Sequence, residues 1–269
     1  MIRLELYDAS LFKYNYKIKN IKLYLMVVSV ILAAGKGTRM KSELPKVLHH
    51  VNGISMIKRV VQLAEELNSE RILVIVGYKA ELIKEELRDF TNLEFVEQTQ
   101  QLGTAHAIMQ CRDALKDYDG EILVLSGDTP FLKVPTINKL LNEYYKNPST
   151  KSVFLTGIVE NPFGLGRVIR DINGSVCRII EEKDASNEDK LIREVNMGIY
   201  VFDCKVLFEV LPKLDCKNKQ NEYYLTDVIE IILKITGILV VGVLVNDPRE
   251  TIGINTIEQL KEAEILFNQ

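Results

Sequence analysis

The stretch VSVILAAGKGTRMKSELPKVL, residues 28–48, is apolar in its first part and basic, with two glycines, in its second. Residues 27–33 are almost all apolar and rich in β-branched side chains, which is typical of a strand buried on both faces. Residues 34–46 hold Gly35, Gly37, Arg39 and Lys46. Glycines let backbone N–H groups converge on an anion, and the two cations add charge. The stretch therefore predicts a buried strand that ends in an anion-binding loop.

A second interpretation of the apolar run is a secretion signal, because lysines precede it and Ala33, Ala34 and Gly35 are small enough for a cleavage site. Cleavage there would delete the first strand and leave the loop without an anchor, so we favour the strand. Residues 1–25 have no clear period, unlike the rest of the chain. One hypothesis takes Met26 as the true start and residues 1–25 as an extension; the alternative is a genuine extra strand or helix.

The loop excludes two common phosphate-binding motifs. The dinucleotide fingerprint G-x-G-x-x-G needs a third glycine where Met40 stands. The Walker A loop needs Gly-Lys-Ser/Thr at the same distance from Gly35, and this sequence lacks it. The pattern that remains is L-A-A-G-x-G-T-R-M followed by Pro45 and Lys46.

Apolar runs and amphipathic segments alternate along the chain. Strands are expected at 27–33, 71–77, 93–96, 121–128, 153–159, 195–202 and 238–245, and helices at 54–67, 80–90, 104–115, 134–145, 225–234 and 256–267. This alternation is typical of parallel βαβ units and predicts a Rossmann-like α/β sheet flanked by helices. Strands at 167–170 and 175–180 flank Asn173-Gly174, a hairpin signal. We expect one domain over residues 26–269, with a small antiparallel lobe inserted at 164–196.

Composition limits the partners and the compartment. The formal net charge of −3 provides no overall positive charge that would attract nucleic acid. No apolar run reaches the roughly 20 residues that span a bilayer. We expect neither nucleic acid nor membrane as a partner. The four cysteines are far apart and form no C-x-x-C pair, which fits a reducing cytoplasm better than a disulfide framework.

The motifs, taken in order, resemble the uridyltransferase domain of bacterial N-acetylglucosamine-1-phosphate uridyltransferase. They are LAAGKGTRM, PKVL, EQTQQLGTAHA, SGDTPFL, GLGRV, EEKDA, VNMGIY, NEYYLTD and GIN. The resemblance covers residues 27 to the C-terminus. It implies transfer of UMP from UTP to N-acetylglucosamine 1-phosphate, giving UDP-N-acetylglucosamine and pyrophosphate, with Mg²⁺ as cofactor.

The resemblance also implies roles for individual residues. Arg39 and Lys46 would stabilise charge in catalysis, and Asp128 and Asn255 would bind Mg²⁺. The nucleotide would contact Leu32, Ala33, Ala34, Gly35, Gly37, Gln98, Gly103 and Thr104. The sugar would contact Gly166, Glu181, Asn196 and Thr226.

Each assignment has a plain structural alternative. Lys46 could be a solvated surface lysine, Asp128 could cap a turn, Asn255 could cap the helix that starts at 256, and Thr104 could cap the helix at 104–115. His106 is interpreted as structural rather than catalytic.

Two departures from the family pattern affect the function. Met197 stands where the family often has threonine, which leaves the exact sugar open. The chain stops after the helix at 256–267, so the left-handed β-helix of the bifunctional enzymes, and its acetyltransferase activity, are not expected. The alternatives are a related nucleotidyltransferase with another sugar or polyol phosphate, and a non-catalytic nucleotide-sugar-binding protein. Oligomeric state is left open.

Overall fold

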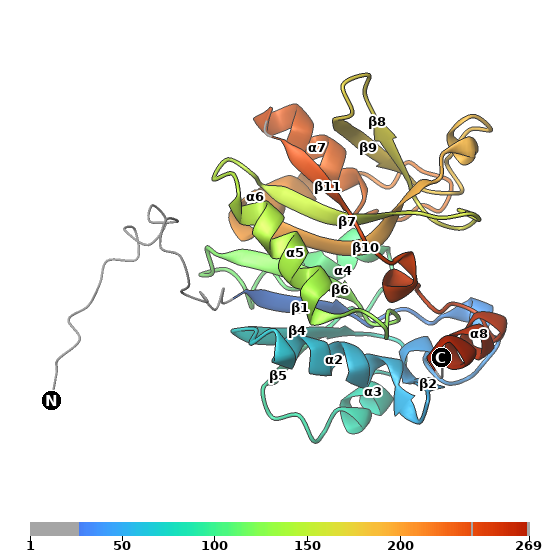
Figure 1. Cartoon of the computed structure of the whole chain (residues 1–269). Helices are drawn as coiled ribbons and strands as arrows, with labels where there is room; N and C mark the ends of the chain where they lie inside the picture. The colour runs from blue at the N-terminus through green and yellow to red at the C-terminus, as the bar shows by residue number, and fades with distance from the viewer. Residues whose placement is uncertain (1–26, 238, 268–269) are drawn as a thin grey trace, which may run out of the picture.

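The computed structural model describes residues 27–237 and 239–267. Its centre is a nine-stranded sheet with helices on both faces (Figure 1). Seven strands follow one another in the order β11-β7-β10-β6-β1-β4-β5. Their bounds are β1 (Val28–Leu32), β4 (Arg71–Val76), β5 (Leu93–Glu97), β6 (Glu121–Ser126), β7 (Ser152–Ile158), β10 (Glu194–Asp203) and β11 (Val240–Leu244).

Strand β1 lies inside the sheet, as an apolar strand with two buried faces should. It pairs in parallel with β4 on one side and with β6 on the other, so that Val30 is opposite both Leu73 and Val124. β5 is parallel to β4 and β11 to β7, whereas β10 is antiparallel to β6 and β7. The predicted mostly parallel α/β sheet is confirmed.

The sheet separates two hydrophobic cores, because successive side chains of a strand point to opposite faces. Val27 and Ile31 pack in one core with helices α2 (Met56–Glu66), α3 (Ala80–Glu86) and α5 (Val134–Tyr145). Val28 and Val30 pack in the other with α4 (Thr104–Met109), α6 (Cys204–Val210) and α7 (Asp227–Thr236). Helix α8 (Ile257–Phe267) packs through Ala263 against Val51 and Met56.

The helix expected over 54–67 begins two residues later, at Met56. Residues 54–55 instead form strand β3 (Ile54–Ser55), which pairs with β2 (His50–Val51) across Asn52-Gly53. Both turn residues have positive φ, 48° and 77°, as a tight hairpin turn with Asn-Gly requires. The side chain of Ser55 then accepts the N–H of Lys58 and caps α2.

Other element bounds also differ from the expected ones. The helix expected over 104–115 ends at Met109 and continues as turns, and the helix expected over 225–234 is α7, residues 227–236. Helix α6 was not expected; Asp203 caps it by accepting the N–H of Val206 at 3.1 Å. The last predicted strand begins at 238, which lies outside the described residues together with the extension 1–25 and the proposed start at Met26.

Residues 164–196 contain the antiparallel hairpin of β8 (Arg167–Arg170) and β9 (Val176–Ile180), which lies at the top of Figure 1. The turn at 171–174 includes Asn173-Gly174, as expected. β8 also joins β10, with Arg167 opposite Val195, so the hairpin is continuous with the main sheet. Among the described residues, no helix is both long and apolar enough to cross a membrane.

Candidate active site

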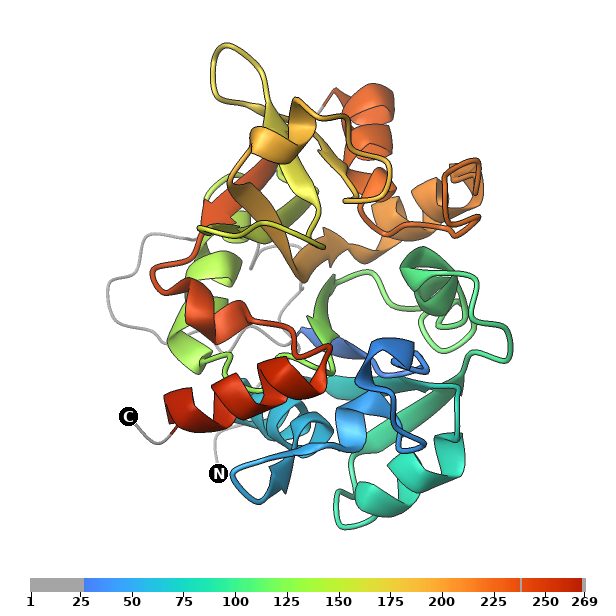
Figure 2. The same ribbon diagram turned by 90° about the vertical axis from the view of Figure 1, so that its right-hand side faces the viewer.

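The predicted site residues gather at one edge of the sheet. β1, β4, β5 and β6 run in the same direction, so the loops that follow them leave the sheet on the same side. The chain runs from β1 through β4 and β5 on one side, and then returns to β6 on the other. Open α/β sheets bind ligands at the carboxyl ends of strands where the strand order reverses in this way. Figure 2 faces this edge, with the loop after β1 in blue and helix α8 in red.

The loop after β1 turns tightly and brings two cations to this edge. Ala33 and Ala34 are buried, whereas Gly35 is exposed, and a side chain there would meet nothing within 4 Å. Gly37 lies against the Lys46 side chain so closely that a Cβ at position 37 would overlap it. The backbone carbonyl of Leu32 accepts the N–H of Gly127, so this residue ties the loop to β6.

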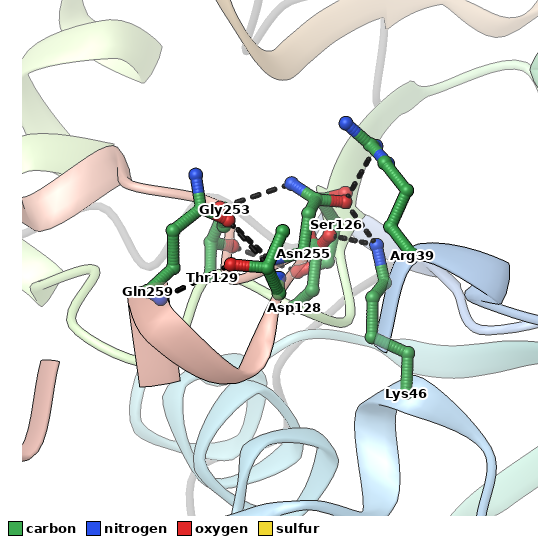
Figure 3. A network of polar contacts seen from close by, with 9 residues as sticks. Arg39, Lys46, Ser126, Asp128, Thr129, Gly253, Asn255 and Gln259 are labelled. Carbon is green, nitrogen blue, oxygen red and sulfur yellow. Dashed lines mark hydrogen bonds and ion pairs between the residues drawn. The ribbon is translucent and has the colours of Figure 1, made fainter. Parts of the chain in front are cut away.

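Four side chains from three segments form a polar cluster (Figure 3). Lys46 Nζ donates to a carboxylate oxygen of Asp128 and, at 2.8 Å, to the amide oxygen of Asn255. Arg39 donates to the same Asn255 oxygen at 2.8 Å. The side chains of Lys46 and Asp128 are only 18% and 10% exposed, so Lys46 is not the solvated lysine of the alternative interpretation.

The carboxylate of Asp128 is held ionised in this cluster. Burial alone would raise the pKa of Asp128, but the charge of Lys46 and the hydrogen bond from its ammonium group outweigh burial and lower that pKa. Asp128 therefore carries a negative charge at neutral pH.

Backbone contacts and a capped helix position Asn255. The N–H of Ile254 donates to the carbonyl of Asp128 at 3.0 Å, which joins the 253–255 segment to the end of β6. Helix α8 is capped by Thr256 and Gln259: the Thr256 hydroxyl accepts the Gln259 N–H, and the Gln259 side chain accepts the N–H groups of Asn255 and Thr256. The alternative in which Asn255 caps this helix is wrong, and its side chain oxygen is free to face the cations.

The oxygen atoms of the Asp128 and Asn255 side chains form a pair that fits a small divalent cation. The Asp128 carboxylate and the Asn255 amide oxygen both lie within hydrogen-bonding reach of one cationic point, Lys46 Nζ. A Cβ on Gly253 would lie 3.5 Å from both Asp128 oxygens, so the absence of a side chain keeps this side of the carboxylate open. Mg²⁺ prefers oxygen ligands and usually takes only one or two carboxylates from the protein. The described residues contain no cluster of three or more His, Cys, Asp or Glu suited to a metal, so an all-protein cage is absent there.

The residues predicted to read the base lie beside the loop after β1. Gln98 follows β5 and is 3% exposed. Its Nε2 donates to the carbonyl of Gly103 at 3.1 Å and lies 3.0 Å from His106 Nδ1. At Gly77 the two loops meet, because a Cβ there would come within 2.9 Å of both the Ala34 and the Gln98 carbonyl oxygens.

A backbone clamp fixes Gly103 and Thr104. The N–H of Tyr223 donates to the Leu102 carbonyl at 2.8 Å, and the N–H of Ala105 donates to the Tyr223 carbonyl at 2.9 Å. Gly103 has φ 109°, and a Cβ on it would lie 2.5 Å from the Tyr223 carbonyl oxygen. The Thr104 hydroxyl accepts the N–H of Leu225 at 3.0 Å and makes no helix cap, so the capping alternative for Thr104 is wrong.

The residues predicted to bind the sugar form a second cluster. Residues 223–226 link it to the loop that carries Gly103 and Thr104. The Asn196 N–H donates to the Gly166 carbonyl at 2.8 Å, and the Thr226 hydroxyl donates to a carboxylate oxygen of Glu181 at 2.9 Å. A Cβ on Gly166 would lie 3.6 Å from that Glu181 oxygen. Burial, with Asp184 and Glu222 nearby, raises the pKa of Glu181. Thr226 follows Tyr223 and Leu225 in the chain. Residues 223–226 therefore contact both the loop that carries Gly103 and the residues predicted to bind the sugar.

Sequence reasoning missed two groups that hold this cluster. Tyr200 is buried, and its hydroxyl accepts from the Asn196 amide at 2.6 Å. Arg167 is 2% exposed and pairs with Glu182 at 2.6 Å, which joins the Gly166 loop to the residue after Glu181. Met197, the departure from the family pattern, is buried in the core against Gly157. A basic residue inside the strand-forming GRVIR run was the available signal for Arg167.

Comparison with known proteins identifies the family and supports the fold. Residues 28–237 match the Nucleotidyl transferase family. The bifunctional protein GlmU of Streptococcus mutans is 44% identical over 236 residues, which are 88% of this chain and 50% of that protein. The bifunctional protein GlmU of Streptococcus gordonii is 44% identical over 241 residues, 90% of this chain and 52% of that protein.

The chain spans about half the length of the curated relatives it matches. A solved structure described as a glucose-1-phosphate thymidylyltransferase from Bacillus anthracis in complex with sucrose superposes with a TM-score of 0.67 at 20% identity, covering 89% of this chain and 94% of that one. This likeness supports the fold, and the sequence match over most of the chain supports the family. The chain belongs to the nucleotidyl transferase family.

Proposed function

We propose that the chain transfers UMP from UTP to N-acetylglucosamine 1-phosphate and releases pyrophosphate and UDP-N-acetylglucosamine. The observation that carries this proposal is the convergence of Arg39, Lys46, Asp128 and Asn255 at the carboxyl edge of the sheet. The choice of substrates rests on the GlmU relatives, which are 43–45% identical over most of this chain.

In this reaction an oxygen of the sugar phosphate attacks the α-phosphorus of UTP, and the bond from that phosphorus to the β-phosphate oxygen breaks. No covalent intermediate is needed, so the protein's contribution is positioning and neutralisation of charge. Lys46 and Arg39 are the cations at hand, and both already face oxygen acceptors in the cluster. We assign them to the triphosphate and to the charge that develops as pyrophosphate leaves.

Asp128 and Asn255 would hold Mg²⁺. The ion would neutralise triphosphate oxygens and orient them for in-line attack. Lys46 would then exchange its hydrogen bonds to these two oxygens for contacts with phosphate.

The remaining residues would bind the two ends of the substrates. Gln98, with the Gly103 and Thr104 backbone, would read the base, while Leu32, the alanines after it, Gly35 and Gly37 would let the nucleotide approach the backbone. Glu181, Asn196, Thr226 and Gly166 offer carboxylate, amide, hydroxyl and carbonyl groups suited to sugar hydroxyl and N-acetyl groups. We place this activity in the cytoplasm, because the four cysteines form no disulfide in the structure and fit a reducing compartment.

Pyrophosphate release measured over a panel of nucleoside triphosphates and sugar 1-phosphates, with and without Mg²⁺, tests the proposal. We expect release with UTP and N-acetylglucosamine 1-phosphate only when Mg²⁺ is present. A clear preference for another sugar or polyol phosphate would make the chain a different member of its family. Absence of release with every pair, together with measurable UDP-sugar binding, would instead identify a non-catalytic binding protein.

A further inference from the structure

The nitrogen of the buried Gln98 amide lies within hydrogen-bonding distance of two protein atoms. Its Nε2 is 3.1 Å from the Gly103 carbonyl oxygen and 3.0 Å from Nδ1 of His106. Because a carbonyl oxygen only accepts, the contact with Gly103 fixes which end of the amide is nitrogen. Among the described residues, no hydrogen bond reaches the Gln98 oxygen. That oxygen is therefore the atom left for a ligand.

The tautomer of His106 decides whether the second N–H of Gln98 is satisfied. The other ring nitrogen, Nε2, lies 3.2 Å from Nε2 of Gln110, so two amide nitrogens face one imidazole. A neutral imidazole has one acceptor nitrogen and can accept from only one of them. Gln98 is 3% exposed, whereas Gln110 is half-buried and also donates to the His106 carbonyl at 3.0 Å. An unsatisfied donor costs more when it is buried, which assigns the acceptor to Nδ1 and the proton to Nε2.

The imidazole itself is held in place. His106 lies in the first turn of α4, and its ring stacks on Tyr223 with centroids 6.4 Å apart and planes 28° apart. Tyr223 is the residue whose backbone clamps the loop that carries Gly103. The same segment therefore fixes both acceptors of the Gln98 amide, the Gly103 carbonyl and the His106 ring.

We infer that His106 is a positioning residue that sets base selectivity: with Gly103 it holds the Gln98 amide so that the site offers an acceptor to the base. Uracil has a ring N–H that can donate to this oxygen, whereas cytosine has an acceptor nitrogen at the same ring position. Turning the amide to suit cytosine would direct its oxygen at the Gly103 carbonyl and leave His106 Nδ1 without a donor. This inference rests on the proposed nucleotidyl transfer and adds to it the origin of discrimination between UTP and CTP.

Two variants separate the ring nitrogens. His106→Asn places an amide atom where Nδ1 stands and can supply an acceptor there, whereas His106→Gln supplies one only at the Nε2 position. We expect His106→Asn to keep the ratio of kcat/KM for UTP over CTP, and His106→Gln to lower it about tenfold, the effect of one lost buried hydrogen bond. The matched control is Gln110→Ala, which should leave the ratio unchanged. Equal ratios for the two His106 variants, or a loss in Gln110→Ala like that in His106→Gln, would overturn the inference.

A second measurement needs no activity. In protein labelled with ¹⁵N-histidine, the ring nitrogen shifts report the tautomer of each of the three histidines, and the His106→Asn spectrum identifies the signals of His106. We expect the Nε2–H tautomer at neutral pH. An Nδ1–H tautomer, or an imidazolium ring, would overturn the inference. If no nucleotide is turned over but the Nε2–H tautomer is found, the proposed function fails and the hydrogen-bond arrangement around Gln98 stands.

Discussion

Removing one member of the buried pair Arg167–Glu182 should destabilise the protein by about 3 kcal/mol. The Arg167 side chain is 2% exposed and that of Glu182 is 17% exposed. Arg167 donates to Glu182 at 2.6 Å and also to the Leu165 carbonyl, and Glu182 accepts the Gly164 N–H at 3.2 Å. These bonds fasten the loop before β8 to the turn after β9.

The magnitude follows from the partners that Arg167→Met leaves behind. The Leu165 carbonyl loses its side-chain donor. Of its partners in the described part of the chain, Glu182 keeps the Gly164 N–H and the distant Lys190, whose Nζ is 3.9 Å away. Breaking a buried pair costs about 3–5 kcal/mol, and the remaining partners of Glu182 place this case at the lower end. Arg167 Nε is buried and has no hydrogen-bond partner among the described residues, so the intact pair is itself incompletely satisfied. Replacing both residues by methionine should therefore cost no more than about 1 kcal/mol.

Urea denaturation of wild type, Arg167→Met, Glu182→Met and the double variant gives the coupling directly. As a control, Lys205→Met removes a surface pair at 3.2 Å whose side chains are more than 70% exposed, and should change the free energy of unfolding by less than about 0.5 kcal/mol. The same two single variants should raise KM for the sugar phosphate more than KM for UTP. Additive costs in the double variant, or a Lys205→Met effect as large as that of Arg167→Met, would refute the reasoning.

Three further predictions concern the site. Lys46→Ala should lower kcat by roughly 10²–10³-fold, as loss of one charge stabiliser does, with a thermal midpoint within about 5 °C of wild type; activity within a few-fold of wild type would remove Lys46 from the reaction. Gly103→Ala should raise KM for UTP at least about tenfold, because its Cβ would meet the Tyr223 carbonyl at 2.5 Å and φ is 109°; an unchanged KM would mean that the clamp yields. Burial, helped by Glu181, raises the pKa of Asp227 from 3.8 to about 6, so the folded state holds this proton more tightly and the free energy of unfolding falls as pH rises between about 4 and 6. The effect of Asp227→Asn on the free energy of unfolding should therefore be about 1 kcal/mol more stabilising at pH 7.5 than at pH 4.5, as measured by urea titrations of both proteins at each pH. An effect that does not change with pH would contradict this sign.

The fold could be predicted where a segment is long enough to show its period. Strands β1, β4 and β6 are runs of five or six residues whose apolar side chains serve both cores, and such runs are legible in the sequence. The hairpin β2–β3 was missed because each strand has only two residues, too few for any alternation, even though Asn52-Gly53 is the same signal that was recognised at Asn173-Gly174. Helix α6 was missed because its seven residues make only about two turns, too few to show a clear helical period.

Some residues of the candidate site could be predicted from the sequence, and others could not. Lys46, Asp128 and Asn255 lie in motifs that resemble those of a known family, and the structure brings them within one hydrogen-bonded cluster. Their functional roles are still predictions. The residues that orient the predicted site residues were not visible in the sequence, because His106 sits in an ordinary amphipathic helix and Tyr200 in an ordinary buried strand.

A rule for finding such partners follows from the cost of burying polar groups. The buried amide of Gln98 and the half-buried amide of Asn196 both need acceptors inside the protein, since an unpaired buried donor costs about 1–3 kcal/mol. Gln98 uses a carbonyl five residues away and a ring eight residues away, and Asn196 uses a tyrosine four residues away on the same strand. In both cases the orienting group is close in sequence, although nothing in its type marks it. Once a buried polar ligand residue is predicted, the acceptors within one or two turns of chain are therefore the first candidates for what fixes its orientation, and with it the specificity of the site.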